Sequence, residues 1–272
     1  MNKKRIFCLL ILITIFSCLF YFLYATKSTL SEKDAFIMVY GNYDATHKGT
    51  LWRNTKLPFD TVWKSGTFAV SEVFFKPFEE AGKKKIFFIT KTIPTSEPYE
   101  CHACLPLLHA TVFVKNKRKW EIESQNLFLL QEGEYAQSPI INLIQVGPDR
   151  YGVTLEFEHI NGASSAKALY LIIPYKKSIT NALEETIYYD NFNICGRSIQ
   201  CATFSASLNF SKIPKNEFYL LKIKRFGTND DEKQHYRAVP VDEEATYQFR
   251  EGKFVQIDWK GYPKIDYEKP LE

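Results

Sequence analysis

Beyond its first 28 residues the chain has no excess of basic side chains, and this absence excludes a nucleic-acid-binding protein. Four of the 35 Lys and Arg residues (Lys3, Lys4, Arg5 and Lys27) lie within residues 1–28, which contain no acid. The remaining 31 are balanced by 31 Asp and Glu residues. Proteins that bind nucleic acids usually carry a basic surplus, because their cations replace the counterions of the phosphates.

The chain also lacks the short motifs of common catalytic sites. It contains no Gly-x-Ser-x-Gly, His-Glu-x-x-His, phosphate-loop or Gly-x-Gly-x-x-Gly pattern. Glu156 and Glu158 are expected on one solvated strand face, whereas a glycosidase pair needs a cleft. His47, His159 and His235 are isolated in the sequence. These absences favour a protein that is not an enzyme, and no cofactor is predicted.

Only one long apolar run is present, and it lies at the N-terminus. Residues 6–24 contain no charge, and nineteen residues of helix span about 28 Å, close to the thickness of a bilayer core. A signal peptide has a shorter apolar region and a small-x-small cleavage site, whereas Leu23-Tyr24-Ala25 places Leu at a small position. The run therefore predicts an uncleaved anchor, with secretion after cleavage as the alternative.

The three basic residues before the run place the N-terminus in the cytoplasm by the positive-inside rule. We divide the chain into a cytoplasmic tip (1–5), a transmembrane anchor (6–24), a tether (25–59), an extracytoplasmic β domain (60–260) and a tail (261–272). The predicted location is a single-pass cytoplasmic (inner) membrane protein, N-in and C-out, with its domain in the periplasm or outside the cell. The predicted partners are this membrane and an unknown envelope protein or ligand.

The tether contains a short helix or strand. Residues 30–41 fit a helix with Ser31 as N-cap, Asp34 in a capping-box-like position and Gly41 as the residue that ends it, although Phe36–Val39 equally fits a strand. Residues 42–59 read as a connection rich in turn residues.

Repeated β-hairpins fill the rest of the chain. Val153, Leu155 and Phe157 alternate with polar residues, a pattern typical of a half-buried strand. Short turns between strands favour antiparallel pairing, because parallel strands need crossovers of a dozen or more residues. The predicted hairpins are 69–75 with 85–92, 110–114 with 120–123, 151–159 with 168–173, 203–210 with 217–226, and 246–249 with 253–257.

The fold class is therefore mainly β, an antiparallel hairpin or meander sheet after one N-terminal transmembrane helix. Residues 111–122 align with residues 246–257, and strands near 140–146, 151–159, 168–173 and 184–190 resemble one meander unit. Such repetition leaves three architectures open: a sandwich, a barrel or a propeller-like array.

Four cysteines follow the anchor, namely Cys101, Cys104, Cys195 and Cys201, and three pairings are open. Local bridges Cys101–Cys104 and Cys195–Cys201 are the simplest, because disulfides persist outside the cytoplasm. A second interpretation is thiol redox chemistry at Cys101-His102-Ala103-Cys104, although a strand rather than a helix follows it. A third is a metal site formed by Cys101, His102, Cys104 and His109.

The segment Cys101-His-Ala-Cys-Leu-Pro resembles a loop shared by uncharacterised bacterial exported proteins, in which a Cys-His-Ala-Cys-x-Pro segment precedes a hairpin whose second strand opens with Trp, here Trp120. The turn at 146–152 and the stretch from Asp190 through Cys195 to Cys201 are similar as well. The resemblance covers roughly residues 60 to 228 and implies a bacterial envelope location, with no activity attached. We expect non-catalytic binding or scaffolding; the alternatives are a thiol-redox or metal-handling protein and a cell-envelope hydrolase.

Overall fold

The computed structural model describes residues 29–54, 66–95, 105–160, 164–196, 200–213, 216–231 and 237–261. Within these ranges the chain forms one short helix and thirteen strands. They are α2 (Glu32–Tyr40), β1 (Gly49–Asn54), β2 (Gly66–Glu80), β3 (Lys83–Pro94), β4 (Leu107–Asn116), β5 (Lys119–Gln131), β6 (Ile140–Gly147), β7 (Arg150–Ile160), β8 (Ser165–Tyr175), β9 (Ser178–Asp190), β10 (Thr203–Ser211), β11 (Leu220–Asp231), β12 (Arg237–Arg250) and β13 (Lys253–Gly261).

The strands form two antiparallel sheets in which every pair joins strands that are consecutive in the chain. The first sheet has the order β1-β2-β3-β4-β5, and the second has the order β13-β12-β11-β10-β9-β8-β7-β6. Both are meanders, which explains why local turn signals in the sequence predicted the pairing. All five predicted hairpins are confirmed: β2–β3, β4–β5, β7–β8, β10–β11 and β12–β13.

The helix begins and ends at its predicted capping residues. The Ser31 hydroxyl accepts a hydrogen bond from the backbone N–H of Asp34, and Gly41 ends the helix in a left-handed conformation with φ +84°. The prediction of a connection over residues 42–59 is wrong in part, because β1 lies there and pairs with β2. Only six residues long, β1 is too short to show a clear alternation in sequence.

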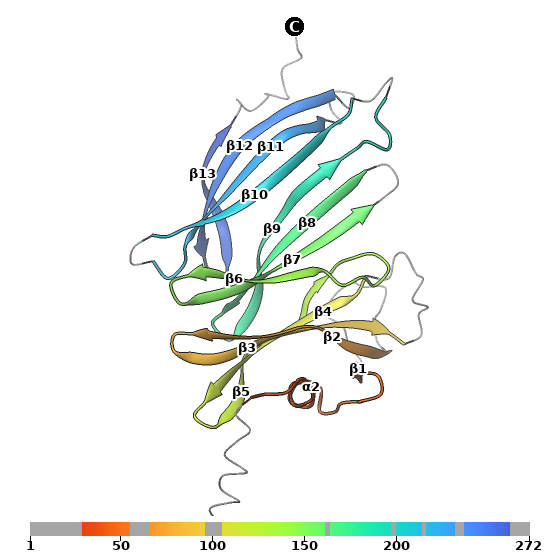
Figure 1. The fold of residues 1–272 in the computed structure, drawn as a ribbon, viewed down its shortest axis with the longest axis vertical. Helices are drawn as coiled ribbons and strands as arrows, with labels where there is room; N and C mark the ends of the chain where they lie inside the picture. Colours follow the sequence, from red (N-terminus) through yellow and green to blue (C-terminus); the bar gives the residue numbers. More distant parts are fainter. Residues whose placement is uncertain are drawn as a thin grey trace, which may run out of the picture.

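Contact between the two sheets forms the main hydrophobic core (Figure 1). Side chains of β3 and β4 pack against side chains of β7 and β8, and each fully buried Leu, Ile, Val or Phe stabilises the fold by about 1.5–3 kcal/mol. The inward alternation predicted for β7 is confirmed. The core comprises Phe87, Ile89, Leu108, Ala110, Val112, Leu129, Val153, Leu155, Phe157, Tyr170, Ile172 and Ile179.

The opposite face of the first sheet is covered by α2 and the residues before it. Phe36 is buried against Phe88 with their ring centroids 5.2 Å apart, and Leu30 belongs to the same cluster. Residues 30–54 lie within the predicted tether, yet α2 and β1 pack as part of the folded unit. The packed domain therefore includes residues from Leu30 onward and does not begin at residue 60.

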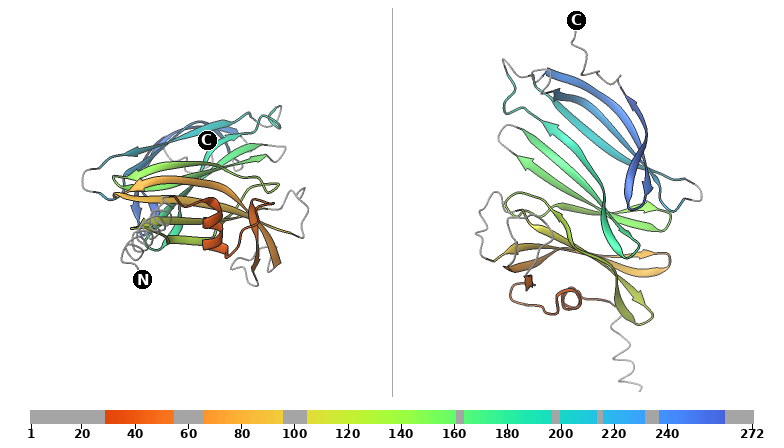
Figure 2. Two further views of the ribbon diagram at one scale, coloured as in Figure 1. Left: turned by 60° about the horizontal axis from the view of Figure 1, so that its bottom comes forward. Right: turned by 180° about the vertical axis from the view of Figure 1, so that it is seen from behind.

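The second sheet curls into a half-barrel, so that β10–β13 form a further layer beyond β6–β9 (Figures 1 and 2). The turn between β12 and β13 approaches β9, where the Thr180 hydroxyl donates to the Gly252 carbonyl at 2.7 Å. At the end of β6, Gly147 lies against the backbone of Glu217, where a Cβ atom would collide. The three open architectures thus resolve to a layered sandwich with a half-barrel, and the propeller-like alternative is wrong.

The predicted anchor at residues 6–24 lies outside the described residues. Among the residues that are described, no helix is both long enough and apolar enough to cross a membrane.

Candidate functional site

A small pocket opens at the edge of the second sheet, where the loop between β5 and β6 meets β7 and β8. Its volume is about 120 Å³. The loop residue Gly133 lies against the Phe157 ring, and its left-handed φ of +99° suits glycine. The lining residues are Gly133, Glu134, Gln137, Ser138, Ile140, Glu156, Phe157, Glu158 and Lys167.

Next to this pocket, His159 lies between two carboxylates of the loop. Its Nε2 atom is 3.3 Å from Oε1 of Glu132, and its Nδ1 atom is 3.8 Å from Oε1 of Glu134. The Tyr170 hydroxyl donates to Oε2 of Glu132 at 3.0 Å. Burial and the adjacent carboxylates of Glu132 and Glu184 raise the pKa of Tyr170, so it remains a neutral donor.

The chemistry open to this pocket is limited by its size and its charge. Ligand pockets typically enclose about 300–1,000 Å³, so this one fits an ion or a single side chain rather than a metabolite. Four Glu residues lie in or beside it, and Lys167 approaches Glu158 at 3.9 Å. Over the described ranges, no three His, Cys, Asp or Glu side chains are grouped so as to hold a metal ion.

His109 lies in a second polar cluster, fully enclosed between the first sheet and α2. The Tyr40 hydroxyl is 2.7 Å from Nδ1 of His109 and 2.6 Å from the Thr90 hydroxyl, while the Thr92 hydroxyl is 3.2 Å from Nε2. The Trp52 ring packs edge-on against the imidazole. Burial lowers the pKa of His109 to about 3, so the ring is neutral.

This environment bears on the predicted metal site. Both ring nitrogens of His109 already lie within hydrogen-bonding distance of hydroxyl groups, and a metal ion would have to displace one of them. The other predicted ligands, Cys101, His102 and Cys104, lie outside the described residues. His235 lies outside them too, and the exposed His47 pairs with Asp44.

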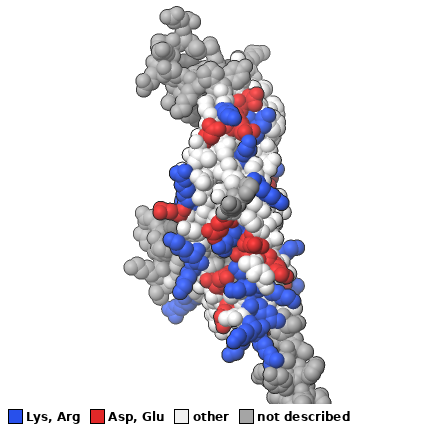
Figure 3. All heavy atoms as spheres, turned by 90° about the vertical axis from the view of Figure 1, so that its left-hand side faces the viewer, with Lys and Arg blue, Asp and Glu red and all other residues white. Residues whose placement is uncertain are grey.

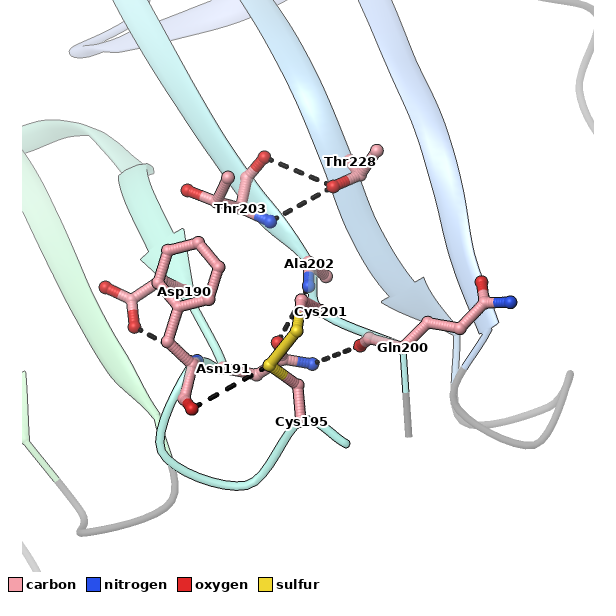
Figure 4. Close-up of a disulfide and its surroundings, with 9 residues drawn as sticks. Asp190, Asn191, Cys195, Gln200, Cys201, Ala202, Thr203 and Thr228 are labelled. Atoms are coloured by element: carbon pink, nitrogen blue, oxygen red, sulfur yellow. Dashed lines mark hydrogen bonds between the residues drawn. A yellow bond between two sulfur atoms is a disulfide. The ribbon is translucent and has the colours of Figure 1, made fainter. Parts of the chain in front are cut away.

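The predicted Cys195–Cys201 disulfide is present, and it closes a loop between β9 and β10 (Figure 4). Asn191 is buried beneath this loop: its side-chain amide donates to the Gln200 carbonyl at 3.0 Å, and its oxygen accepts from the Ala202 N–H at 2.7 Å. The loop exposes Phe192 and Ile194. Covalent and polar bonds together hold two apolar side chains toward solvent.

Sequence reasoning missed an ionic network that joins the two sheets. Oε1 of Glu80 accepts from Lys85 at 3.0 Å and from Arg150 at 3.3 Å, and Oε2 accepts from the N–H of Tyr151. Lys85 also pairs with Glu123 at 2.6 Å. The sequence places Glu80 in a polar turn and Lys85 at the start of the next strand, and no local pattern marks either charge as buried.

A second unpredicted network spans strands of the half-barrel. Arg225 donates through Nε and Nη2 to both oxygens of Glu185, at 2.7 and 2.6 Å, and through Nη1 to Glu243. Trp259 donates its indole N–H to the other oxygen of Glu243. These contacts raise the pKa of the guanidinium, although burial acts in the opposite direction. The network braces β9, β11, β12 and β13.

The polar groups of the two ionic networks and of the His109 cluster thus bond mainly to one another across layers of the fold. The pocket beside His159 is the exception, since it opens to solvent. Comparison with known protein families, with curated proteins and with solved structures finds no match for this chain.

Proposed function

We propose that the chain is a non-catalytic binding or scaffolding protein of the bacterial envelope. Residues 6–24 anchor it in the cytoplasmic membrane with the N-terminus inside, and the β domain lies outside the cytoplasm. The domain would present its surface to an envelope protein or ligand.

The Cys195–Cys201 disulfide supports this proposal most directly. Structural disulfides persist in the periplasm and outside the cell, whereas cytosolic thiols are kept reduced. The bridge also accords with the uncharged run before the domain, since such a run directs a domain across the membrane.

The buried polar clusters support a structural rather than a catalytic role for most of the ionisable groups. Glu80, Lys85 and Arg150 join the two sheets, and Arg225 joins strands of the half-barrel. A binding protein needs a rigid scaffold of this kind, because preorganisation lowers the entropic cost of association.

Protease accessibility in spheroplasts tests the location. An external protease should degrade the β domain of the full chain, and alkaline extraction should leave the intact protein in the membrane fraction. The variant L12K/F16K should lose the membrane association, because each Lys at a helix centre costs about 3 kcal/mol of insertion free energy. The matched variant L12I/F16L should behave as the parent chain. A domain protected in spheroplasts would contradict the proposal.

Peptide mapping without reduction tests the compartment independently. Protein isolated under alkylating conditions should yield a Cys195–Cys201 linked peptide. The same map will show whether Cys101 and Cys104 are bridged or alkylated, and alkylation of both would favour the thiol-redox alternative. Reduced Cys195 and Cys201 in freshly lysed cells would place the domain in a reducing compartment.

A further inference from the structure

One end of the first sheet carries a concentration of basic side chains, although the chain beyond residue 28 is neutral overall. The turn of the β4–β5 hairpin reads Lys-Asn-Lys-Arg-Lys over residues 115–119, and the turn of the β2–β3 hairpin leads into Lys83 and Lys84. Pairing of Lys85 with Val114 places both turns at the same end of the sheet. We call Lys83, Lys84, Lys115, Lys117, Arg118 and Lys119 the basic end; Lys and Arg gather at the lower end of Figure 3.

Neighbouring acids compensate only part of this charge: Glu79 lies opposite Lys84 on the paired strand, and Glu121 accepts from Asn116 in the β4–β5 turn. Within the described part of the chain, Lys83, Lys84, Lys117 and Lys119 are exposed and form no ion pair. The nearby carboxylates of Glu80 and Glu123 are held by the buried Lys85. A positive potential of this kind attracts anions over roughly one Debye length, about 8 Å at physiological ionic strength.

The basic end lies where the described chain begins. Leu30 packs in one cluster with Phe113 and Trp120, which flank the basic turn of β4–β5. Figures 1 and 2 show the start of the described chain beside this hairpin from opposite sides. Thr29 is five residues after Tyr24, the last residue of the apolar run, and five residues span at most about 18 Å.

Exposed apolar side chains lie on α2 and β5, two elements that pack in one cluster beside the basic turn of β4–β5. Ile37 and Met38 are exposed, on the side of α2 that faces away from the sheet, and Ile122 is exposed on β5 just after the basic turn. Basic residues combined with exposed apolar ones are typical of protein surfaces that rest in the headgroup region of a membrane.

We propose that the basic end lies against anionic phospholipid headgroups of the membrane that holds residues 6–24. This inference rests on the proposed function, since the anchor brings the surface to the bilayer. Contact there would fix the orientation of the domain and point the half-barrel, with the Cys195–Cys201 loop, away from the membrane (Figure 1). The exposed Phe192 and Ile194 would then face the envelope space.

Lysine acylation of the full chain in nanodiscs tests the proposal. Discs of phosphatidylcholine alone are compared with discs that also contain phosphatidylglycerol, and the modification of each lysine is followed by mass spectrometry. Lys117 and Lys119 should react several-fold more slowly in the anionic discs, and high salt should abolish the difference. Lys253 and Lys260 of β13, and Lys212 just after β10, are internal controls and should react equally in both.

A charge variant then tests the cause. The variant K83Q/K84Q/R118Q keeps Lys117 and Lys119 as reporters and should lose most of their protection. The matched variant K212Q/K224Q/K253Q removes the same charge from the second sheet and should retain it. The buried Lys85 is retained in both variants and should stay unreactive, which shows that each variant is folded. The comparison of lipids in the parent chain needs no variant.

The outcomes separate the two proposals. A chain that enters nanodiscs but shows equal reactivity of Lys117 and Lys119 in both lipids overturns the contact with headgroups alone. Equal protection by inorganic phosphate in phosphatidylcholine discs would indicate a site for free anions and overturns it as well. A chain that fails to enter nanodiscs overturns the anchor, and with it the inference.

Discussion

Neutralising Glu80 should destabilise the protein far more than the same change at an exposed carboxylate. The Glu80 side chain is 6% exposed and that of its partner Lys85 is 8% exposed, so both charges are desolvated. The substitution E80Q keeps the size and an acceptor oxygen, but it removes the charge that attracts Lys85, Arg150 and the N–H of Tyr151.

The expected magnitude follows from these three hydrogen bonds. A hydrogen bond to a charged group contributes about 1.5–3 kcal/mol and a neutral one about 0.5–1.5 kcal/mol, so each of the three loses about 1 kcal/mol. Arg150 is 42% exposed and also pairs with Glu217, which reduces its share. Lys85 keeps Glu123. We expect the free energy of unfolding to fall by about 2–3 kcal/mol.

Urea unfolding of the detergent-solubilised chain, followed by near-ultraviolet circular dichroism, measures this change. E158Q is the matched control, because Glu158 is 51% exposed and its pair with Lys167 spans 3.9 Å. It should change the free energy by about 0.5 kcal/mol or less. Equal effects of E80Q and E158Q would refute the claim that Glu80 bonds the two sheets across a desolvated contact.

Two predictions concern how the stability of the contact between α2 and the first sheet depends on pH. Burial lowers the pKa of His109 to about 3, below its unfolded value, so the contribution of His109 to the free energy of unfolding is complete above about pH 6.5 and falls by about 3 kcal/mol as the pH drops to 4. The variant H109Q should flatten the fall of the urea midpoint at acid pH, whereas H47Q at an exposed position should not. Burial and the neighbouring Glu32 carboxylate raise the pKa of Glu72 to about 7, so the protonated form favours folding and stability is lost as pH rises from about 4.5 through 7. The variant E72Q should remove that loss of stability, about 1 kcal/mol after allowance for solvent screening, whereas E79Q should retain it. If H109Q and E72Q show the same pH dependence of the urea midpoint as the parent chain, the pKa shifts given to His109 and Glu72 are wrong.

The local elements of the fold were predictable because their determinants are local. Period-two alternation identified the strands of the hairpins, and short turns established their antiparallel pairing. Ser31 and Gly41 marked the ends of α2. The missed strand β1 has only six residues, and its pairing with β2 depends on contacts far along the chain.

The arrangement of the hairpins was not predictable, because sequence patterns do not state which hairpins share a sheet. The apparent repeat shows the difficulty. Residues 111–122 and 246–257 are both hairpins, with turns at Lys117-Arg118 and at Glu251-Gly252. The sequence alignment instead places Lys117 and Arg118 opposite Gly252 and Lys253, so the two turns are out of step by one residue. A displacement of one residue exchanges the faces of a strand, so the similarity is not a structural repeat.

The candidate site residues divide in the same way. The Cys195–Cys201 bridge closes a short loop, and its short spacing made it one of the simplest pairings among the three that the sequence left open. His159 seemed isolated, but its carboxylate partners come from a loop that precedes it by more than twenty residues. Glu80 and Lys85 flank a tight turn whose sequence looks solvent-exposed, and only the contact between sheets shows that they are buried.

One signal of the layering was present in β3. Residues 85–90 of this antiparallel strand are buried without alternation, and Ile86–Ile89 form a continuous apolar run. An antiparallel strand with one solvated face would alternate, so a continuous run indicates a sheet covered on both faces. Here α2 covers one face and β6–β9 cover the other. The polar residues Thr90, Thr92 and His109 lie on the face beneath α2, where they must bond to one another, because a buried polar group without a partner costs about 1–3 kcal/mol.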